Sequence, residues 1–308
     1  MVCCAANQLD SWTVHIDGIL ALIRQATYNL ALIHLDVRTQ LQHYLILMLR
    51  YFMAPGAIPE HLLQWSPELI PSSAPEMFPA IRLVDIMVRF MKLHSSVHYN
   101  PDLDPDKVVQ PALYIDDEME EWVTTLPEKW SYIVKESRDL QYTFNGKYIT
   151  YNDQWASRDL NHYHYSRLML NEMILAHLAR VKYPTPWHLK QRQRVLATIS
   201  RMATGICAGA ASQMGLFGYE DTAKERQNLP PLNGVFMLLF PLSVAGSAAG
   251  APAEVQAWVV KTLQRIGDTM GVHRALQLIP KVQQDREMSL RRLDRLHEVN
   301  VQLNLPSR

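Results

Sequence analysis

The chain has 308 residues, and its 30 Lys+Arg balance its 30 Asp+Glu, so the formal net charge is zero at pH 7. A neutral chain argues against whole-surface binding to nucleic acid or anionic membrane, because both select basic proteins. Hydrophobic residues make up 48% of the sequence and charged residues 19%, which excludes an intrinsically disordered chain.

In the first third of the chain, apolar residues recur at the three- and four-residue spacing of amphipathic helices. This spacing predicts helices over residues 12–23, from Asp36 to Met53, over the short stretch His61–Trp65, and from Pro79 to about His94. The segment Ser66–Pro79 contains four prolines and is predicted to be a loop.

The middle of the chain contains the strongest turn signals. Pro101–Pro111 is predicted to be rich in turns, and Ala112–Thr124 to be a helix with an acidic face that Leu126-Pro127 ends. Tyr142–Tyr151 has Asn145-Gly146 at its centre, which is the best hairpin signal in the sequence.

The last half is again helical in its periodicity. Helices are predicted over Asp159 to about Val181, Trp187 to about Met214, Val235–Val244, Pro252–Met270, Val272–Leu278 and Lys281 to about Val301. The predicted fold class is all-α, with about ten helices in a single compact domain over residues 1–308 and one small β-hairpin near residues 142–151.

One segment, Gly234–Ala253, carries no charge over 20 positions, about the length that a bilayer requires. Pro241 and Pro252 interrupt it, and its Ser/Ala/Gly half is only weakly apolar. We therefore predict a buried helix hairpin broken by proline, and no membrane partner.

The cysteines and the amino-terminal residues favour a reducing compartment. Only Cys3, Cys4 and Cys207 are present, so neither a disulfide framework nor a four-thiolate zinc site is expected. The first residues lack a basic stretch followed by an apolar one, so no secretory signal is predicted. The expected location is cytoplasmic or nuclear.

Several segments together carry a family resemblance. They are Ser11–Gln25 (SWTVHIDGILALIRQ), Leu126-Pro127 with Trp130, the aromatic and acidic positions Tyr148, Tyr151, Asp153 and Trp155, then Asn161–Glu172 (NHYHYSRLMLNE), Asn233–Gly246 (NGVFMLLFPLSVAG), Trp258, and Ile266–Leu276 (IGDTMGVHRAL). In this order the chain resembles the regulatory domain of fungal zinc binuclear cluster transcription factors. The resemblance implies an all-helical regulatory domain and a link to natural-product biosynthesis.

The chain departs from that family at the DNA-binding module. The family's module holds two zinc ions between six cysteines, and three cysteines cannot build it. The basic residues of Arg286–Arg295 alternate with acidic ones, which is typical of a solvated helix. Direct DNA binding is therefore not expected, and a truncated transcription factor is one interpretation of the sequence.

The residues most suggestive of chemistry are His162–Tyr165, two imidazoles and two phenols in one helical turn. His162 and His164 lie about 200° apart around a helix and cannot share a metal ion, whereas His162 and Tyr165 lie on neighbouring positions. Aromatic packing with hydrogen-bonded polar tips is one interpretation. The other is a pocket in which His164 and Tyr165 act as acid and base.

Asp153 is the third candidate catalytic residue, and it allows three roles: capping the next helix, orienting a histidine, or pairing with Arg167. The candidate ligand-binding residues around these three are His162, Tyr163, Trp155, Tyr151 and Arg167. The ligand expected from them is an apolar small-molecule metabolite.

Other chemistries find little support in the sequence. His94 and His98 have the HxxxH spacing of metal ligands but lack the following glutamate, so no metal site is predicted. GxSxG, GxGxxG and P-loop motifs are absent, which removes the usual hydrolase and nucleotide-binding interpretations and predicts no cofactor.

Three hypotheses follow. The leading one is a small-molecule-binding protein of fungal secondary metabolism, built on a transcription-factor-like domain and able to act as a cofactor-free cyclase or isomerase through His, Asp and Tyr. The second is a transcriptional co-regulator without its own DNA-binding module, which acts through partner proteins as a homo- or heterodimer. The third is the truncated transcription factor.

Overall fold

The computed structural model describes residues 18, 37–53, 58, 75–216 and 232–303. The helices predicted over residues 12–23 and 61–65 lie outside these residues. Contacts within the chain divide it into two units, Met1–Leu103 and Asp104–Arg308, and each is described by itself. The prediction of one domain over residues 1–308 stays a prediction.

The fold is all-α with one small antiparallel sheet, as the periodicity predicted. The described residues form eight α-helices, somewhat fewer than the ten expected. One reason is that the two helices predicted between Val272 and Val301 are a single helix, α10 (His273–Leu303), which runs through Pro280.

The first unit contains α2 (Val37–Met53), the short 3₁₀ helix η3 (Pro75–Met77) and α4 (Phe78–Tyr99). α2 packs against α4, and the rings of Phe52 and Phe90 stack between them with centroids 5.1 Å apart. The ring of His94 meets the edge of this pair, and its Nδ1 lies 3.2 Å from the hydroxyl of Tyr51.

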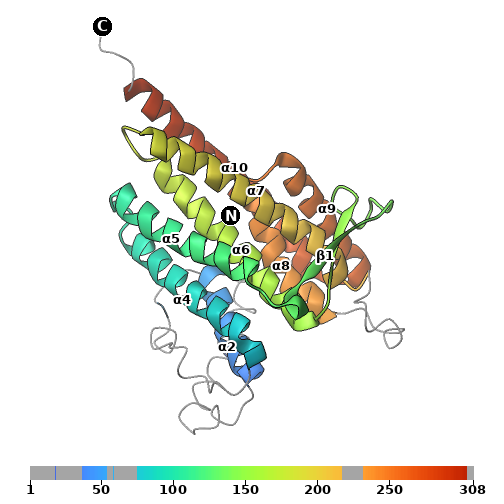
Figure 1. The fold of residues 1–308 in the computed structure, drawn as a ribbon. Helices are drawn as coiled ribbons and strands as arrows, with labels where there is room; N and C mark the ends of the chain where they lie inside the picture. Colours follow the sequence, from blue (N-terminus) through green and yellow to red (C-terminus); the bar gives the residue numbers. More distant parts are fainter. Residues whose placement is uncertain (1–17, 19–36, 54–57, 59–74, 217–231, 304–308) are drawn as a thin grey trace. The chain divides into compact units, whose positions relative to one another are not determined.

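The second unit is built around α6 (Gln154–Leu178), which packs between α5 (Pro105–Thr124) and α7 (Pro186–Gln213), as Figure 1 shows. α6 also contacts α8, so its side chains are buried on nearly every side. A helix surrounded in this way must place its polar residues against other polar groups of the protein. This requirement explains most of the site described below.

Helices α8 (Leu232–Ser247), α9 (Ala253–Met270) and α10 complete the second unit. They approach closely because glycine residues lie where the helices cross. A Cβ atom at Gly246 would lie 2.8 Å from Val282 and 2.9 Å from Val259, and one at Gly267 would overlap Leu276. These two positions therefore require the smallest side chain.

The sheet pairs β1 (Tyr132–Glu136), which follows the 3₁₀ helix η4 (Glu128–Trp130), with β2 (Lys147–Tyr151). Asn145 and Gly146 both have positive φ, 54° and 74°, and form the predicted tight turn. However, the first strand lies at Tyr132–Glu136 and not directly before that turn. The intervening residues form further turns, which the alternation of side chains does not reveal.

Pro111 and Pro280 were predicted to lie at helix boundaries, and both lie inside helices. α5 begins at Pro105, where the carboxylate of Asp104 accepts a hydrogen bond from the backbone N–H of Asp106 at 3.0 Å, and the helix continues through Pro111. The prediction of a turn-rich segment over Pro101–Pro111 is therefore wrong for its second half. Proline removes one helical hydrogen bond, and packing of both flanking turns compensates for that loss here.

Of the described helices, α7 alone is long and apolar enough to cross a bilayer. Of the apolar window that qualifies, 67% is buried within the protein, as is typical of a core helix. The segment Gly234–Ala253, considered above as a span, instead contains most of α8, a turn, the N-cap Pro252 and the first residue of α9.

Candidate functional site

His162 and Tyr165 form a buried pair on α6. Nδ1 of His162 lies 2.8 Å from the hydroxyl of Tyr165, and both residues are at most 3% exposed. Burial, together with the positive charge of Arg158, lowers the pKa of His162 to about 3, and burial raises the pKa of Tyr165. Both side chains are therefore uncharged at neutral pH, and each satisfies a polar group of the other.

His164 is on a different side of α6, facing α7. A Cβ atom placed on Gly205 of α7 would lie 2.9 Å from its Nε2, so the ring and the glycine are in close contact. A ring nitrogen donates a hydrogen bond to the carbonyl oxygen of Leu160. Burial and the charges of Arg167 and Arg201 lower the pKa of His164 to about 4, which keeps the imidazole neutral.

A buried ion pair between Arg167 of α6 and Asp116 of α5 joins the two helices, and Tyr163 supports it. The guanidinium of Arg167 binds Asp116 through two hydrogen bonds and donates a third to the hydroxyl of Tyr163 at 2.6 Å. Burial disfavours the positive charge of Arg167, but the hydrogen bonds and negative charge of Asp116 outweigh it and raise the pKa of Arg167. Burial raises the pKa of Tyr163 to about 12. Arg167 is therefore a cation whose charge is neutralised inside the protein.

The pair is the centre of a larger cluster that includes α7. Arg194 binds both Asp116, at 3.0 Å, and Asp117, and Arg201 binds Glu120 through two hydrogen bonds. Arg167 also forms an ion pair with Glu120. We refer to Asp116, Asp117, Glu120, Arg167, Arg194 and Arg201 as the charge cluster.

Sequence reasoning identified Arg167 and missed the rest of the charge cluster. The signals available were the acidic face predicted for Ala112–Thr124 and the basic residues near Arg194. Nothing in the spacing shows that these two segments meet across α6.

Asp153 is the N-cap of α6. Its carboxylate accepts hydrogen bonds from the backbone N–H groups of Trp155 at 2.7 Å and Ala156 at 3.2 Å. Capping is therefore the role that the structure shows, and Arg167 pairs with Asp116 instead. Eleven residues of helix, or about 16 Å along its axis, separate Asp153 from His164.

The two aromatic candidates near the start of α6 also lie apart from the histidines. Tyr151 ends β2, is buried, and has its hydroxyl against Gly209 of α7. The ring of Trp155 lies 4.9 Å from the guanidinium carbon of Arg158. The candidate residues therefore fall into separate groups along α6, and their proposed roles in catalysis and ligand binding stay predictions.

A second acid–base arrangement inside the protein was not anticipated. The carboxylate of Glu172 on α6 accepts hydrogen bonds from the backbone N–H groups of Gly250, at 2.9 Å, and Ala249. From α10, Arg286 donates to the carbonyl oxygens of Ala248 and Ala251, both at 2.6 Å. An acid and a base thus hold the turn between α8 and α9 from two directions, and we call this arrangement the turn clamp.

The described part of the chain contains no group of side chains suited to metal binding or to thiol chemistry. No three His, Cys, Asp or Glu side chains within it are arranged to hold a metal ion. Cys207 is fully buried on α7, and burial raises the pKa of its thiol, so the reactive thiolate is disfavoured.

Comparison with known proteins gives no relative: no family model, no curated protein and no solved structure matches the chain.

Proposed function

We propose that the chain is a helical regulatory domain, as the resemblance to fungal zinc binuclear cluster transcription factors implies, and that it acts by binding other proteins. One observation carries this proposal. The polar side chains in the middle of α6 bond to groups of their own protein: His162 to Tyr165, Tyr163 to Arg167, and Asn161 to Gln213 at 3.1 Å.

Such bonding has a clear physical consequence. A catalytic acid or base must reach a substrate atom at hydrogen-bond distance. Groups that are buried and bonded to each other satisfy one another and make the packing of the helices specific. The polar content of α6 is thus accounted for by the construction of the domain, and function is expected on its surface.

A tethering experiment tests the proposal. The full chain is fused to a heterologous DNA-binding domain, and transcription is measured from a reporter that carries the matching sites. We expect a several-fold change relative to the DNA-binding domain alone. Asp116→Ala, which disrupts the charge cluster, should abolish the change, while Asp117→Ala should preserve it. An unaltered reporter with a well-expressed fusion would overturn the proposal.

A second candidate function is the handling of an apolar metabolite, favoured by His164. Its imidazole is neutral at physiological pH and can accept a proton if a substrate reaches it. Purified protein is incubated with extract from a strain that lacks the gene. Conversion of an accumulated compound that is lost in His164→Gln, but kept in the capping-competent Asp153→Ser, would establish this function. Unchanged extracts would exclude it.

A further inference from the structure

The charges of the second unit are strongly segregated, although the chain is neutral overall. Residues 173–219 contain six Arg or Lys and no Asp or Glu, while α5 contains six acidic residues and one lysine. Part of the basic segment is used internally, because Arg194 and Arg201 bind carboxylates of α5 in the charge cluster.

The remaining basic residues lie around the start of α7. Within the described residues, no carboxylate lies at ion-pair distance from Lys182, Lys190 or Arg192. Lys182 and Lys190 are exposed, and Arg192 is half-buried. The charges of these three residues are therefore not paired with a carboxylate in the described structure.

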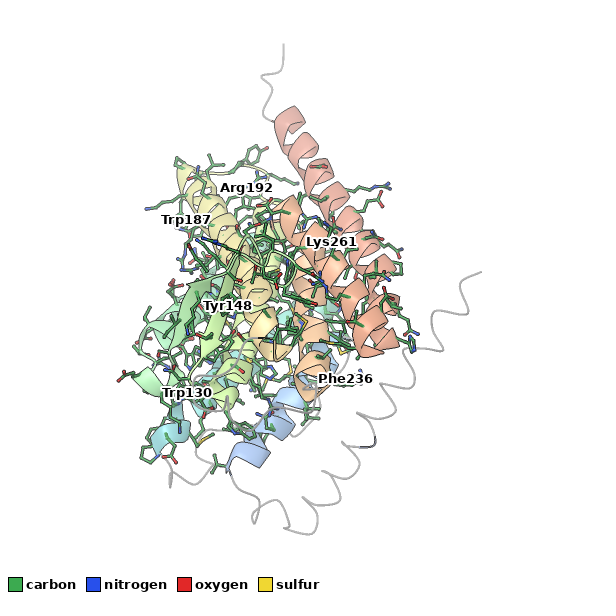
Figure 2. All side chains as sticks on the ribbon, turned by 90° about the vertical axis from the view of Figure 1, so that its right-hand side faces the viewer. Trp130, Tyr148, Trp187, Arg192, Phe236 and Lys261 are labelled. Atoms are coloured by element: carbon green, nitrogen blue, oxygen red, sulfur yellow. The ribbon has the colours of Figure 1, made fainter. Side chains whose placement is uncertain are left out.

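Large apolar side chains are exposed among these charges. Tyr183 is 74% exposed, Leu189 52% and Trp187 38%. Tyrosine and tryptophan are enriched where proteins bind one another, and nearby lysines attract partners of opposite charge. We call Lys182, Tyr183, Trp187, Leu189 and Lys190 the corner surface, and Figure 2 shows Trp187 and Arg192 at the same end of the molecule.

We propose that the corner surface binds an acidic segment of a partner protein that also carries large apolar side chains. Carboxylates of that segment would pair with Lys182 and Lys190, and its apolar residues would cover Tyr183 and Trp187. Within the chain, the same helix already binds the acidic α5 through Arg194 and Arg201. This proposal rests on the proposed function, since it names the chemistry of the partner.

A neighbouring acid distinguishes this partner from other anions. Nε2 of His188 lies 3.0 Å from the carboxylate of Asp106, whose side chain is 56% exposed. A continuous anionic surface, such as a bilayer or a nucleic acid backbone, would meet this carboxylate and be repelled by it. A peptide can place its own carboxylates on either side of Asp106, so the peptide is the better match.

The test uses the full chain and a short fluorescein-labelled peptide of alternating aspartate and leucine, with binding followed by fluorescence anisotropy. Lys182→Glu/Lys190→Glu should weaken binding at least about tenfold, because two attractive contacts become repulsive. The matched control is Lys129→Glu/Lys261→Glu, which changes the charge equally at two exposed lysines and should bind as wild type. Figure 2 shows Lys261 and Trp130, the residue that follows Lys129 in the sequence, apart from Trp187.

A third variant tests the apolar part of the surface. Trp187→Ala should weaken binding several-fold at every salt concentration, whereas added salt should weaken wild-type binding by screening the lysines. Thermal unfolding of each variant confirms that it is folded.

Equal binding by the two double variants, or no binding to the peptide, would overturn the proposal. Tighter binding to phosphatidylserine vesicles or to oligothymidylate than to the peptide would also overturn it, in favour of a lipid or nucleic acid surface. If the tethered chain changes reporter transcription but the peptide does not bind, only the corner surface is wrong. If the peptide binds and the reporter is unchanged, only the proposed regulatory function is wrong.

Discussion

The guanidinium of Arg167 and the carboxylate of Asp116 meet in parallel, with Nε 2.7 Å from Oδ1 and Nη2 3.2 Å from Oδ2. Both residues are at most 1% exposed, so each charge depends on the other for the hydrogen bonds that water would otherwise supply. Asn171 adds a further hydrogen bond to Asp116 at 2.7 Å. The contact between α5 and α6 is therefore specified by charge as well as by apolar packing.

Removal of Asp116 should leave the buried positive charge of Arg167 without its main partner. Asp116→Ala is expected to lower the free energy of unfolding by about 3–5 kcal/mol, measured by urea denaturation. Asp117→Ala is the control, because the Asp117 side chain is 61% exposed and its ion pair should contribute less than about 1 kcal/mol. Equal losses in the two variants would contradict the central role of Asp116.

The contact between Gly205 and His164 predicts that Gly205→Ala has opposite effects on stability with and without the imidazole. Gly205→Ala should destabilise the wild-type protein by about 1–3 kcal/mol, because a methyl group would press on the imidazole. In a His164→Ala background the same change should be stabilising, because alanine favours the helix by about 1 kcal/mol and the obstacle is gone. Urea denaturation of the four proteins gives the coupling energy, and strictly additive effects would refute the contact.

The depressed pKa values of His162 and His164 predict acid sensitivity. The ordinary pKa of about 6.5 applies in the unfolded chain, which therefore binds more protons than the folded chain below that pH. Stability is complete above about pH 6.5 and should fall toward pH 4 by up to about 1.4 kcal/mol per pH unit for each histidine.

Unfolding free energies measured between pH 7 and pH 5 test this slope. The His164→Gln variant should show a shallower dependence than wild type, since it removes one of the histidines whose pKa is lowered by burial. His98→Gln is the control at an exposed histidine and should leave the slope unchanged. Identical slopes in wild type and His164→Gln would show that His164 is not buried as a neutral base.

The turn clamp predicts a difference between two substitutions of Glu172. Burial raises the pKa of Glu172 and so disfavours its charge. Glutamine keeps one acceptor oxygen for the N–H of Gly250, at 2.9 Å, and gives up only the longer hydrogen bond from Ala249, at 3.3 Å. Glu172→Gln should therefore change stability by less than about 1 kcal/mol. Glu172→Ala leaves the backbone N–H groups of Ala249 and Gly250 without a partner and should cost about 1–3 kcal/mol.

Amide hydrogen exchange at Gly250 provides a local measurement of the clamp. Exchange should accelerate in Glu172→Ala and stay close to wild type in Glu172→Gln. Glu254→Ala, at an exposed position on α9, is the matched control. Unchanged protection of Gly250 in Glu172→Ala would mean that Arg286 alone holds the turn.

The role of Asp153 as an N-cap predicts which substitutions it tolerates. Asp153→Ala should destabilise the protein by about 1 kcal/mol, whereas Asp153→Ser keeps an oxygen that can accept from the N–H groups of Trp155 and Ala156 and should be nearly neutral. Thermal unfolding compares the two. A loss of stability in Asp153→Ser as large as in Asp153→Ala would argue against capping.

The sequence determined the class of fold because local spacing is enough to identify helices. The periodicity placed α2, α4, α6, α7, α8 and α9 close to their observed positions, and Asn145-Gly146 located the turn before β2. It failed at Pro111 and Pro280, where packing of the surrounding turns outweighs the helix-breaking tendency of proline. It also failed at β1, because residues distant in the sequence set the pairing of strands.

The candidate site shows the same division. The sequence selected His162, His164, Tyr165 and Arg167 as unusual residues for a long helix, and each of these side chains is buried. Only the tertiary structure revealed that His162 bonds to Tyr165, that His164 faces Gly205, and that Arg167 pairs with Asp116 from another helix. Composition and spacing report which groups are present, but burial and the partners brought by other helices decide their charge and accessibility, and these arise only when the helices pack.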